Sequence, residues 1–130
     1  MDVDGARAQR VESRRILIVD DDPQVLGLFT DILSEGGYDV LAVASGKAAM
    51  QAIQHDPVDL LVLDLSMPEP DGFEMLKVLR ATKPDLKILV ISGFIQGILL
   101  RAAQLVGATA TLNKTDAPEL LLPTVRDLLG

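Results

Sequence analysis

Two kinds of segment alternate along most of this chain. Short apolar runs such as "ILIV" and "LLVL" lack internal polar positions, which is typical of strands covered on both faces of a sheet. Longer segments between them carry apolar residues at helical spacing. The pattern predicts strands at residues 15–19, 38–44, 60–63, 86–91 and 109–112, and helices at about 23–35, 46–54, 72–80, 94–106 and 117–129.

The predicted elements have start and stop signals of their own. Pro23 suits the first turn of a helix, and Gly36 and Gly37 suit its end. Ser45 and Asp71 can each cap the helix that follows. A strand and a helix alternating five times predict an α/β fold, a doubly wound parallel sheet with helices on both faces.

Composition narrows the class of protein. The chain has 130 residues, 48% of them hydrophobic, which is enough for one domain with its own core. We interpret residues 1–13 as a flexible polar leader and residues 14–130 as the domain. No secretory signal, membrane-length apolar run or cysteine occurs, so we expect a cytoplasmic protein that does not contact a membrane. The net charge of −7 argues against nucleic-acid binding by this domain.

Polar residues follow four of the predicted strands. In an open parallel sheet the carboxyl ends of the strands meet at one edge, where such folds bind ligands. We therefore expect one crevice to hold the residues at these ends, which are Asp20, Asp21, Asp22, Asp64, Ser92 and Lys114. Taken singly, each has an ordinary explanation. Asp20, Asp21 and Asp22 could be solvated loop acids, and Asp64 an acid in a turn. Ser92 could be a turn residue and Lys114 a surface lysine.

Together, these residue types suggest a particular chemistry. Mg²⁺ takes one or two protein carboxylates together with waters and a phosphate. Asp64 could be a metal ligand or a nucleophile, since an aspartyl carboxylate can accept a phosphoryl group. Mg²⁺, Lys114 and the Ser92 hydroxyl would then balance the negative oxygens of the transferred group.

Four segments in order, "ILIVDDDP", "LLVLDLSMPEPDGFEMLKVLR", "ILVISG" and "GATATLNK", resemble the successive signatures of the response regulator receiver domain of two-component signalling, the CheY-like family. The resemblance extends over residues 14–129. It implies a flavodoxin-like (βα)5 fold with strand order 2-1-3-4-5. It also implies a phospho-acceptor signalling domain, not an enzyme, although the domain assists its own phosphorylation and dephosphorylation.

The resemblance assigns a role to each site residue. Asp64 would accept a phosphoryl group from a phosphohistidine on a sensor histidine kinase or a histidine phosphotransfer protein. Asp21 would bind Mg²⁺ directly, Asp20 through a water, and Ser66 through its backbone carbonyl. Ser92 would hydrogen-bond the phosphoryl group and Lys114 would pair with it.

Two positions depart from the family pattern. The lysine is usually followed by proline, but Thr115 follows Lys114 here. Three residues before the lysine the family commonly has Tyr or Phe, and this chain has Thr111. A threonine cannot fill an aromatic pocket, so we expect the coupling of Ser92 to the output surface to be altered.

Other residues receive simpler interpretations. Asp22 beside Pro23 needs no role beyond the helix start. His55, the sole histidine, lies near a helix C-terminus, where a cation is favoured, and we interpret it as structural. The 94–106 helix is apolar nearly all round, which suggests a homodimer or partner interface; packing with a few exposed aliphatic residues is the alternative.

Two other functions compete with phosphoryl signalling. A receiver-fold interaction module no longer controlled by phosphorylation would explain Thr111 and Thr115. A haloacid-dehalogenase-like phosphatase also uses an Asp nucleophile and Mg²⁺, but its second acid would fall on Ser66, and the chain has no room for a large cap domain. Rapid turnover of phosphate esters would identify the phosphatase.

Overall fold

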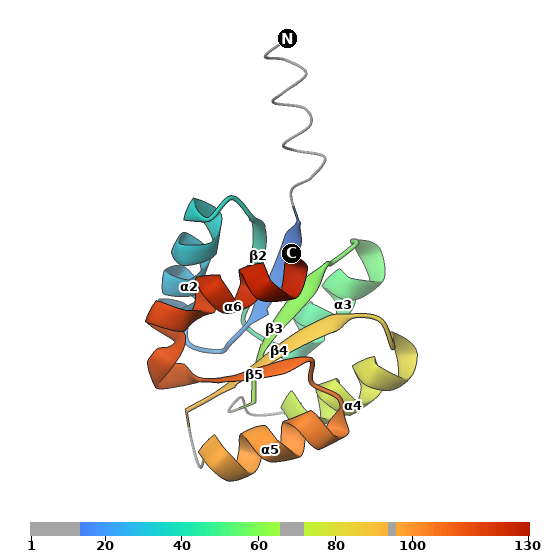
Figure 1. The fold of residues 1–130 in the computed structure, drawn as a ribbon. Helices are drawn as coiled ribbons and strands as arrows, with labels where there is room; N and C mark the ends of the chain where they lie inside the picture. The colour runs from blue at the N-terminus through green and yellow to red at the C-terminus, as the bar shows by residue number, and fades with distance from the viewer. Residues whose placement is uncertain (1–13, 66–71, 94–95) are drawn as a thin grey trace.

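The computed structural model of the protein describes residues 14–65, 72–93 and 96–130. Five parallel strands form one sheet in the order β2-β1-β3-β4-β5 (Figure 1). This confirms the doubly wound, flavodoxin-like fold and the strand order that the family resemblance implies. The elements are β1 (Arg15–Val19), α2 (Pro23–Glu35), β2 (Asp39–Val43), α3 (Gly46–His55), β3 (Leu60–Asp64), α4 (Gly72–Thr82), β4 (Lys87–Ser92), α5 (Gln96–Val106), β5 (Ala110–Asn113), a 3-10 turn (Lys114–Asp116) and α6 (Ala117–Leu129).

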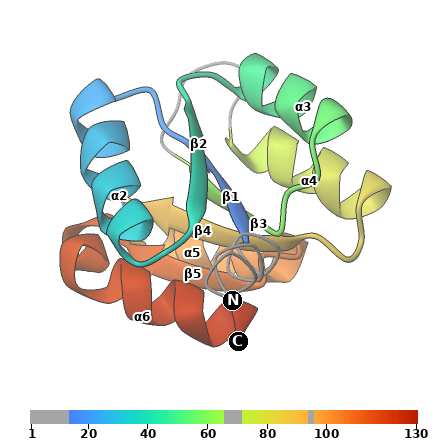
Figure 2. The ribbon, with the colours of Figure 1, turned by 90° about the horizontal axis from the view of Figure 1, so that it is seen from above.

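Helices cover both faces of the sheet, with α2 and α6 on one side and α3, α4 and α5 on the other (Figure 2). Successive side chains of a strand point to opposite faces, so each strand contributes to two cores. In β1, Leu17 and Val19 pack with α3 and α4, whereas Ile16 and Ile18 pack with α2 and α6. This double burial explains why the strands are apolar at every position instead of at alternate ones.

The helix boundaries follow the signals in the sequence. Asp22 is the N-cap of α2 and Pro23 is its first residue. Ser45 caps α3, where its Oγ accepts a hydrogen bond from the Ala48 N–H at 3.1 Å. At the end of α2, Gly37 has a φ of 98°, in the left-handed region that favours glycine.

A few boundaries differ from the prediction. Asp64 and Ser92 are the last residues of β3 and β4, because Asp64 still pairs with Ile91 of β4 and Ser92 with Asn113 of β5. Lys114 begins a short 3-10 turn that the apolar pattern does not signal. The predicted leader at 1–13, the Asp71 cap and Ser66 lie outside the described residues. In the part of the chain that is described, no helix combines the length and the apolar character needed to cross a membrane.

Candidate functional site

The carboxyl ends of the strands bring the predicted site residues to one edge of the sheet. Asp20 follows β1, Asp64 and Ser92 end β3 and β4, and Lys114 follows β5. Carboxylate oxygens of Asp20, Asp21 and Asp64 all lie within 4.8 Å of one another. The sheet thus brings Asp64 and Lys114 together although they are 50 positions apart in the sequence.

Asp20 is almost completely buried, with 1% of its surface exposed. Its backbone N–H donates to the Val43 carbonyl of β2 at 3.2 Å, and its Oδ1 accepts the Asp22 N–H at 2.9 Å. Burial raises the pKa of the Asp20 carboxyl, and the nearby charge of Asp64 adds to that rise. Lys114 and the Asp22 N–H act in the opposite direction without cancelling the effect of burial.

Lys114 bridges the two buried carboxylates. Its Nζ lies 2.9 Å from Asp20 Oδ2 and 3.3 Å from Asp64 Oδ2. Burial acts to lower the pKa of Lys114, but the hydrogen bond to Asp20 and the charges of Asp64 and Asp20 outweigh it, so the pKa is raised. The lysine is therefore a permanent cation that offsets part of the repulsion between two buried acids.

The site has the properties of a cation-binding centre. Its three carboxylates offer oxygen ligands alone, the donor type that Mg²⁺ prefers. Asp20 Oδ2 is buried, and the Lys114 ammonium 2.9 Å away is its counter-charge. One lysine beside three clustered carboxylates leaves negative charge that a bound cation would offset. The residues present therefore fit a Mg²⁺ ion.

Ser92 lies on the strand next to Asp64. Asp64 pairs with Ile91 across the β3–β4 ladder, so Ser92 is one residue beyond the partner of Asp64. Its side chain is fully buried, and it pairs with Asn113 of β5. The serine predicted to contact the phosphoryl group thus belongs to the same edge as the acids and Lys114.

Gly72, the first residue of α4, belongs to the site although the sequence reasoning gave it no role. A Cβ at this position would lie 2.8 Å from both the Asp64 carbonyl oxygen and Leu65 Cα. Real Cβ atoms essentially never approach backbone so closely, so α4 can begin here only because residue 72 has no side chain. The glycine of the "MPEPDG" segment was the available signal.

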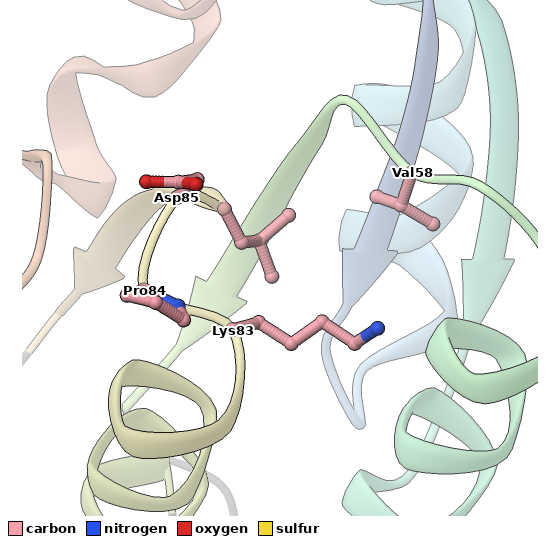
Figure 3. Close-up of a pocket in the computed structure, with 5 residues that line it drawn as sticks. Val58, Lys83, Pro84 and Asp85 are labelled. Atoms are coloured by element: carbon pink, nitrogen blue, oxygen red, sulfur yellow. The ribbon is translucent and has the colours of Figure 1, made fainter.

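A separate hollow of about 310 Å³ lies at the opposite edge of the sheet (Figure 3). Its lining combines apolar and charged side chains from the segments that precede β3 and β4, namely Val58, Lys83, Pro84, Asp85 and Leu86. None of the predicted site residues lines it. The candidate site and this hollow therefore lie at opposite ends of the strands.

Two residues outside the cluster can be compared with their expected roles. His55 Nδ1 lies 2.8 Å from the Gln51 carbonyl oxygen, a contact within the last turns of α3 that agrees with a structural role. On α5, Leu105 has 85% of its surface exposed, whereas Ala103 is buried. An exposed leucine on the outer face of α5 agrees with a segment that is apolar nearly all round.

Comparison with known proteins identifies the family. The response regulator receiver domain family matches residues 16–126. Response regulator MprA of Mycobacterium tuberculosis is 42% identical over 118 residues, which are 90% of this chain and 51% of that protein. MprA of Mycolicibacterium vanbaalenii is 41% identical over 116 residues, 88% of this chain and 50% of its own. The chain thus spans about half the length of these curated relatives.

Solved structures agree with the sequence comparison. A CheY-like receiver domain protein from Methanospirillum hungatei has a TM-score of 0.84 at 28% identity, over 91% of this chain and 94% of that one. The chemotaxis response regulator CheY4 of Vibrio cholerae has a TM-score of 0.81 at 29% identity, over 89% and 98% of the two chains. The chain belongs to the response regulator receiver domain family of two-component systems.

Proposed function

We propose that this domain accepts a phosphoryl group on Asp64 in a Mg²⁺-dependent reaction, and that it then signals through protein–protein contacts. The donor would be a phosphohistidine on a sensor histidine kinase or a histidine phosphotransfer protein, the partners that receiver domains generally have. The observation that carries the proposal is the buried Asp20–Lys114–Asp64 arrangement at the carboxyl edge of the sheet.

Each site residue has its own role in the phosphoryl transfer. An Asp64 oxygen attacks the phosphorus, and the new O–P bond forms as the P–N bond to the donor histidine breaks, with the bonding electron pair leaving on the imidazole nitrogen. Lys114, already 3.3 Å from Asp64, pairs with a phosphoryl oxygen, and the Ser92 hydroxyl donates to another. Asp20, Asp21, Asp64 and the Ser66 backbone carbonyl would hold Mg²⁺. The ion supplies positive charge for the phosphoryl oxygens when bound.

The same mechanism makes the domain a stoichiometric acceptor and not an enzyme with external turnover. The reacting carboxylate belongs to the chain, so each molecule takes one phosphoryl group and its later hydrolysis restores the acid. A phosphatase would instead release phosphate continuously from an added ester. We therefore expect no sustained hydrolysis of phosphate esters.

The first experiment records the intact mass after incubation with Mg²⁺ and acetyl phosphate. The wild type is expected to gain one phosphoryl group, and Asp64→Asn or EDTA is expected to abolish the gain. Asp59→Asn is a matched control, because Asp59 lies just before the start of the same strand that Asp64 ends. No gain together with no Mg²⁺ binding by calorimetry would favour an interaction module independent of phosphorylation. Uptake by Asp64→Asn would place the acceptor elsewhere.

The contact surface for signalling is proposed to include α5. Leu105 is largely exposed there, and Thr111 of β5 meets α5 through a hydrogen bond from Gln104 Nε2 at 3.4 Å. Leu105→Asp is expected to leave phosphoryl uptake unchanged while it abolishes association, either of two copies or with a partner. Light scattering before and after phosphorylation measures the association of two copies. Unchanged self-association of the variant would remove Leu105 from a homodimer interface.

The proposed location is the cytoplasm, where sensor kinases present their phosphohistidines, and nucleic-acid binding is not expected from a domain with a net charge of −7.

A further inference from the structure

Asp22 connects the start of α2 to the candidate site through three hydrogen bonds. Its side-chain Oδ1 accepts the Gln24 N–H at 2.9 Å, which makes it the N-cap of the helix. Its carbonyl oxygen accepts the Leu26 N–H at 3.0 Å. Its own N–H donates to Asp20 Oδ1 at 2.9 Å. One exposed residue thus joins a helix terminus to a carboxylate that is almost fully buried.

These contacts determine which way the Asp20 carboxylate faces. With Oδ1 occupied by the Asp22 N–H, Oδ2 is the oxygen that lies toward the site, 2.9 Å from Lys114 Nζ. The position of that N–H depends on the backbone at residue 22, which is extended, with φ −94° and ψ 113°, before the chain turns into the helix. The side-chain cap stabilises this turn.

We propose that Asp22 is a positioning residue for the acidic site. By capping α2, its side chain holds the backbone N–H that orients Asp20 toward Lys114 and Asp64. The role belongs to the hydrogen-bond acceptor and not to the negative charge, because the side chain is exposed and its bond is to a backbone N–H. Its value for cation binding rests on the proposed function, but the orientation of Asp20 does not.

Three variants separate this role from the alternatives. Asp22→Asn keeps an equally good N-cap and removes the charge, whereas Asp22→Ala removes the cap. Ser45→Ala removes the N-cap of α3, whose bond goes to Ala48, and so reproduces the loss of a cap away from Asp20. For each variant we would determine a cation-free crystal structure and measure Mg²⁺ affinity by calorimetry, at a temperature where all variants are folded.

Asp22→Ala is expected to release Asp20 Oδ1 from the N–H of residue 22 and to weaken Mg²⁺ binding about tenfold, as loss of a residue that orients a metal ligand commonly does. Asp22→Asn should keep that contact and bind Mg²⁺ within about threefold of the wild type, the remaining change reflecting one exposed charge. Ser45→Ala should bind Mg²⁺ like the wild type even if its stability falls as far as that of Asp22→Ala.

Several results would overturn the proposal: an unchanged Asp20 orientation in Asp22→Ala, equal weakening by Asn and Ala, or equal weakening by Ser45→Ala. A wild type that binds no Mg²⁺ would contradict the proposed function instead, and the crystal structures would then decide the positioning role by themselves.

Discussion

The carboxyl edge of the sheet, where the strands end, and the amino edge, where they begin, contain the same types of charged residue in different surroundings. At the carboxyl edge, three aspartates cluster, and Lys114 contacts Asp20 and Asp64, whose side chains are 2% and 3% exposed. At the amino edge, three other aspartates meet Arg15. Its side chain contacts Asp39 at 2.9 Å and Asp56 at 3.7 Å, and its N–H contacts Asp59 at 2.8 Å.

The difference lies in solvent and not in composition. The side chains of Asp39 and Asp56 are 53% and 45% exposed, so water screens their charges and the ion pairs contribute little to stability. Burial at the carboxyl edge removes that screening, so the acids there depend on Lys114 or on a bound cation. The two clusters therefore differ in the free-energy cost of their charges, which burial raises at the carboxyl edge.

Removal of the basic side chain should have the most unequal effects on stability at the two edges. Lys114→Met leaves two buried carboxylates without their cation, so we expect the free energy of unfolding to fall by about 2–4 kcal/mol at neutral pH in EDTA. Arg15→Met should cost less than about 1 kcal/mol. Urea denaturation measures both. Equal losses would show that burial does not distinguish the edges.

Arg80, in the last turn of α4, sharpens the comparison because its partners at the amino edge are backbone carbonyl oxygens. Its guanidinium donates to the carbonyl oxygens of Gly107, Pro84 and Leu86 at 2.9, 2.8 and 2.9 Å. We expect Arg80→Gln to lower the free energy of unfolding by about 2 kcal/mol, more than Arg15→Met does, because the bonds to Gly107 and Leu86 are partly buried. Urea denaturation should show this loss, and hydrogen exchange of the backbone amides at 83, 85–86 and 107–108 should accelerate. A loss below that of Arg15→Met would contradict it.

Two glycines test whether the carboxyl edge is also the more closely packed region. Gly72→Ala places a Cβ against the Asp64 backbone and should destabilise the fold by about 1–2 kcal/mol and slow phosphoryl uptake. A Cβ added at Gly27, within α2, would meet no atom within 4 Å, so Gly27→Ala should stabilise the protein by about 0.5–1 kcal/mol. Thermal denaturation and the acetyl phosphate assay measure these effects. Normal phosphoryl uptake by Gly72→Ala would show that the end of β3 at Asp64 can be displaced without loss of reactivity.

The smallest effect concerns the charge on Asp20. Burial raises its pKa, so the folded state holds the proton more tightly than the unfolded chain, and the ionised form costs stability at neutral pH. That cost should diminish as the pH falls through the raised pKa and vanish below the ordinary value of 3.8. In EDTA at pH 7, Asp20→Asn should therefore be more stable than the wild type and Asp39→Asn slightly less stable. A destabilised Asp20→Asn would mean that its pairing with Lys114 outweighs burial.

Much of the fold was predictable from local pattern. The apolar run Ile16–Val19 marks a strand covered on both faces, and Asp22-Pro23 and Gly36-Gly37 mark the ends of one helix. Such signals work because each reflects the environment or backbone geometry of its own element. The 3-10 turn at Lys114 carries no apolar pattern of its own, which is why its conformation was not predicted.

The members of the candidate site were also predictable, but not their contacts. Parallel strands place Asp20, Asp64 and Lys114 at one edge whatever their spacing in the sequence. That Lys114 bridges both acids, and that Gly72 must lack a side chain, follows from packing between elements. Asp22 shows the same limit, since its sequence context indicates a helix cap and nothing of its bond to Asp20.

The sequence by itself determined the strand and helix segments, the family and the residues available for chemistry, because these depend on short-range pattern and on ordered motifs. The tertiary structure alone decided which charges lost their water and which group faces each of them. The physical reason is that burial and distance are set jointly by the register of β1, β3, β4 and β5 and by the helices that cover them. No single segment contains that information.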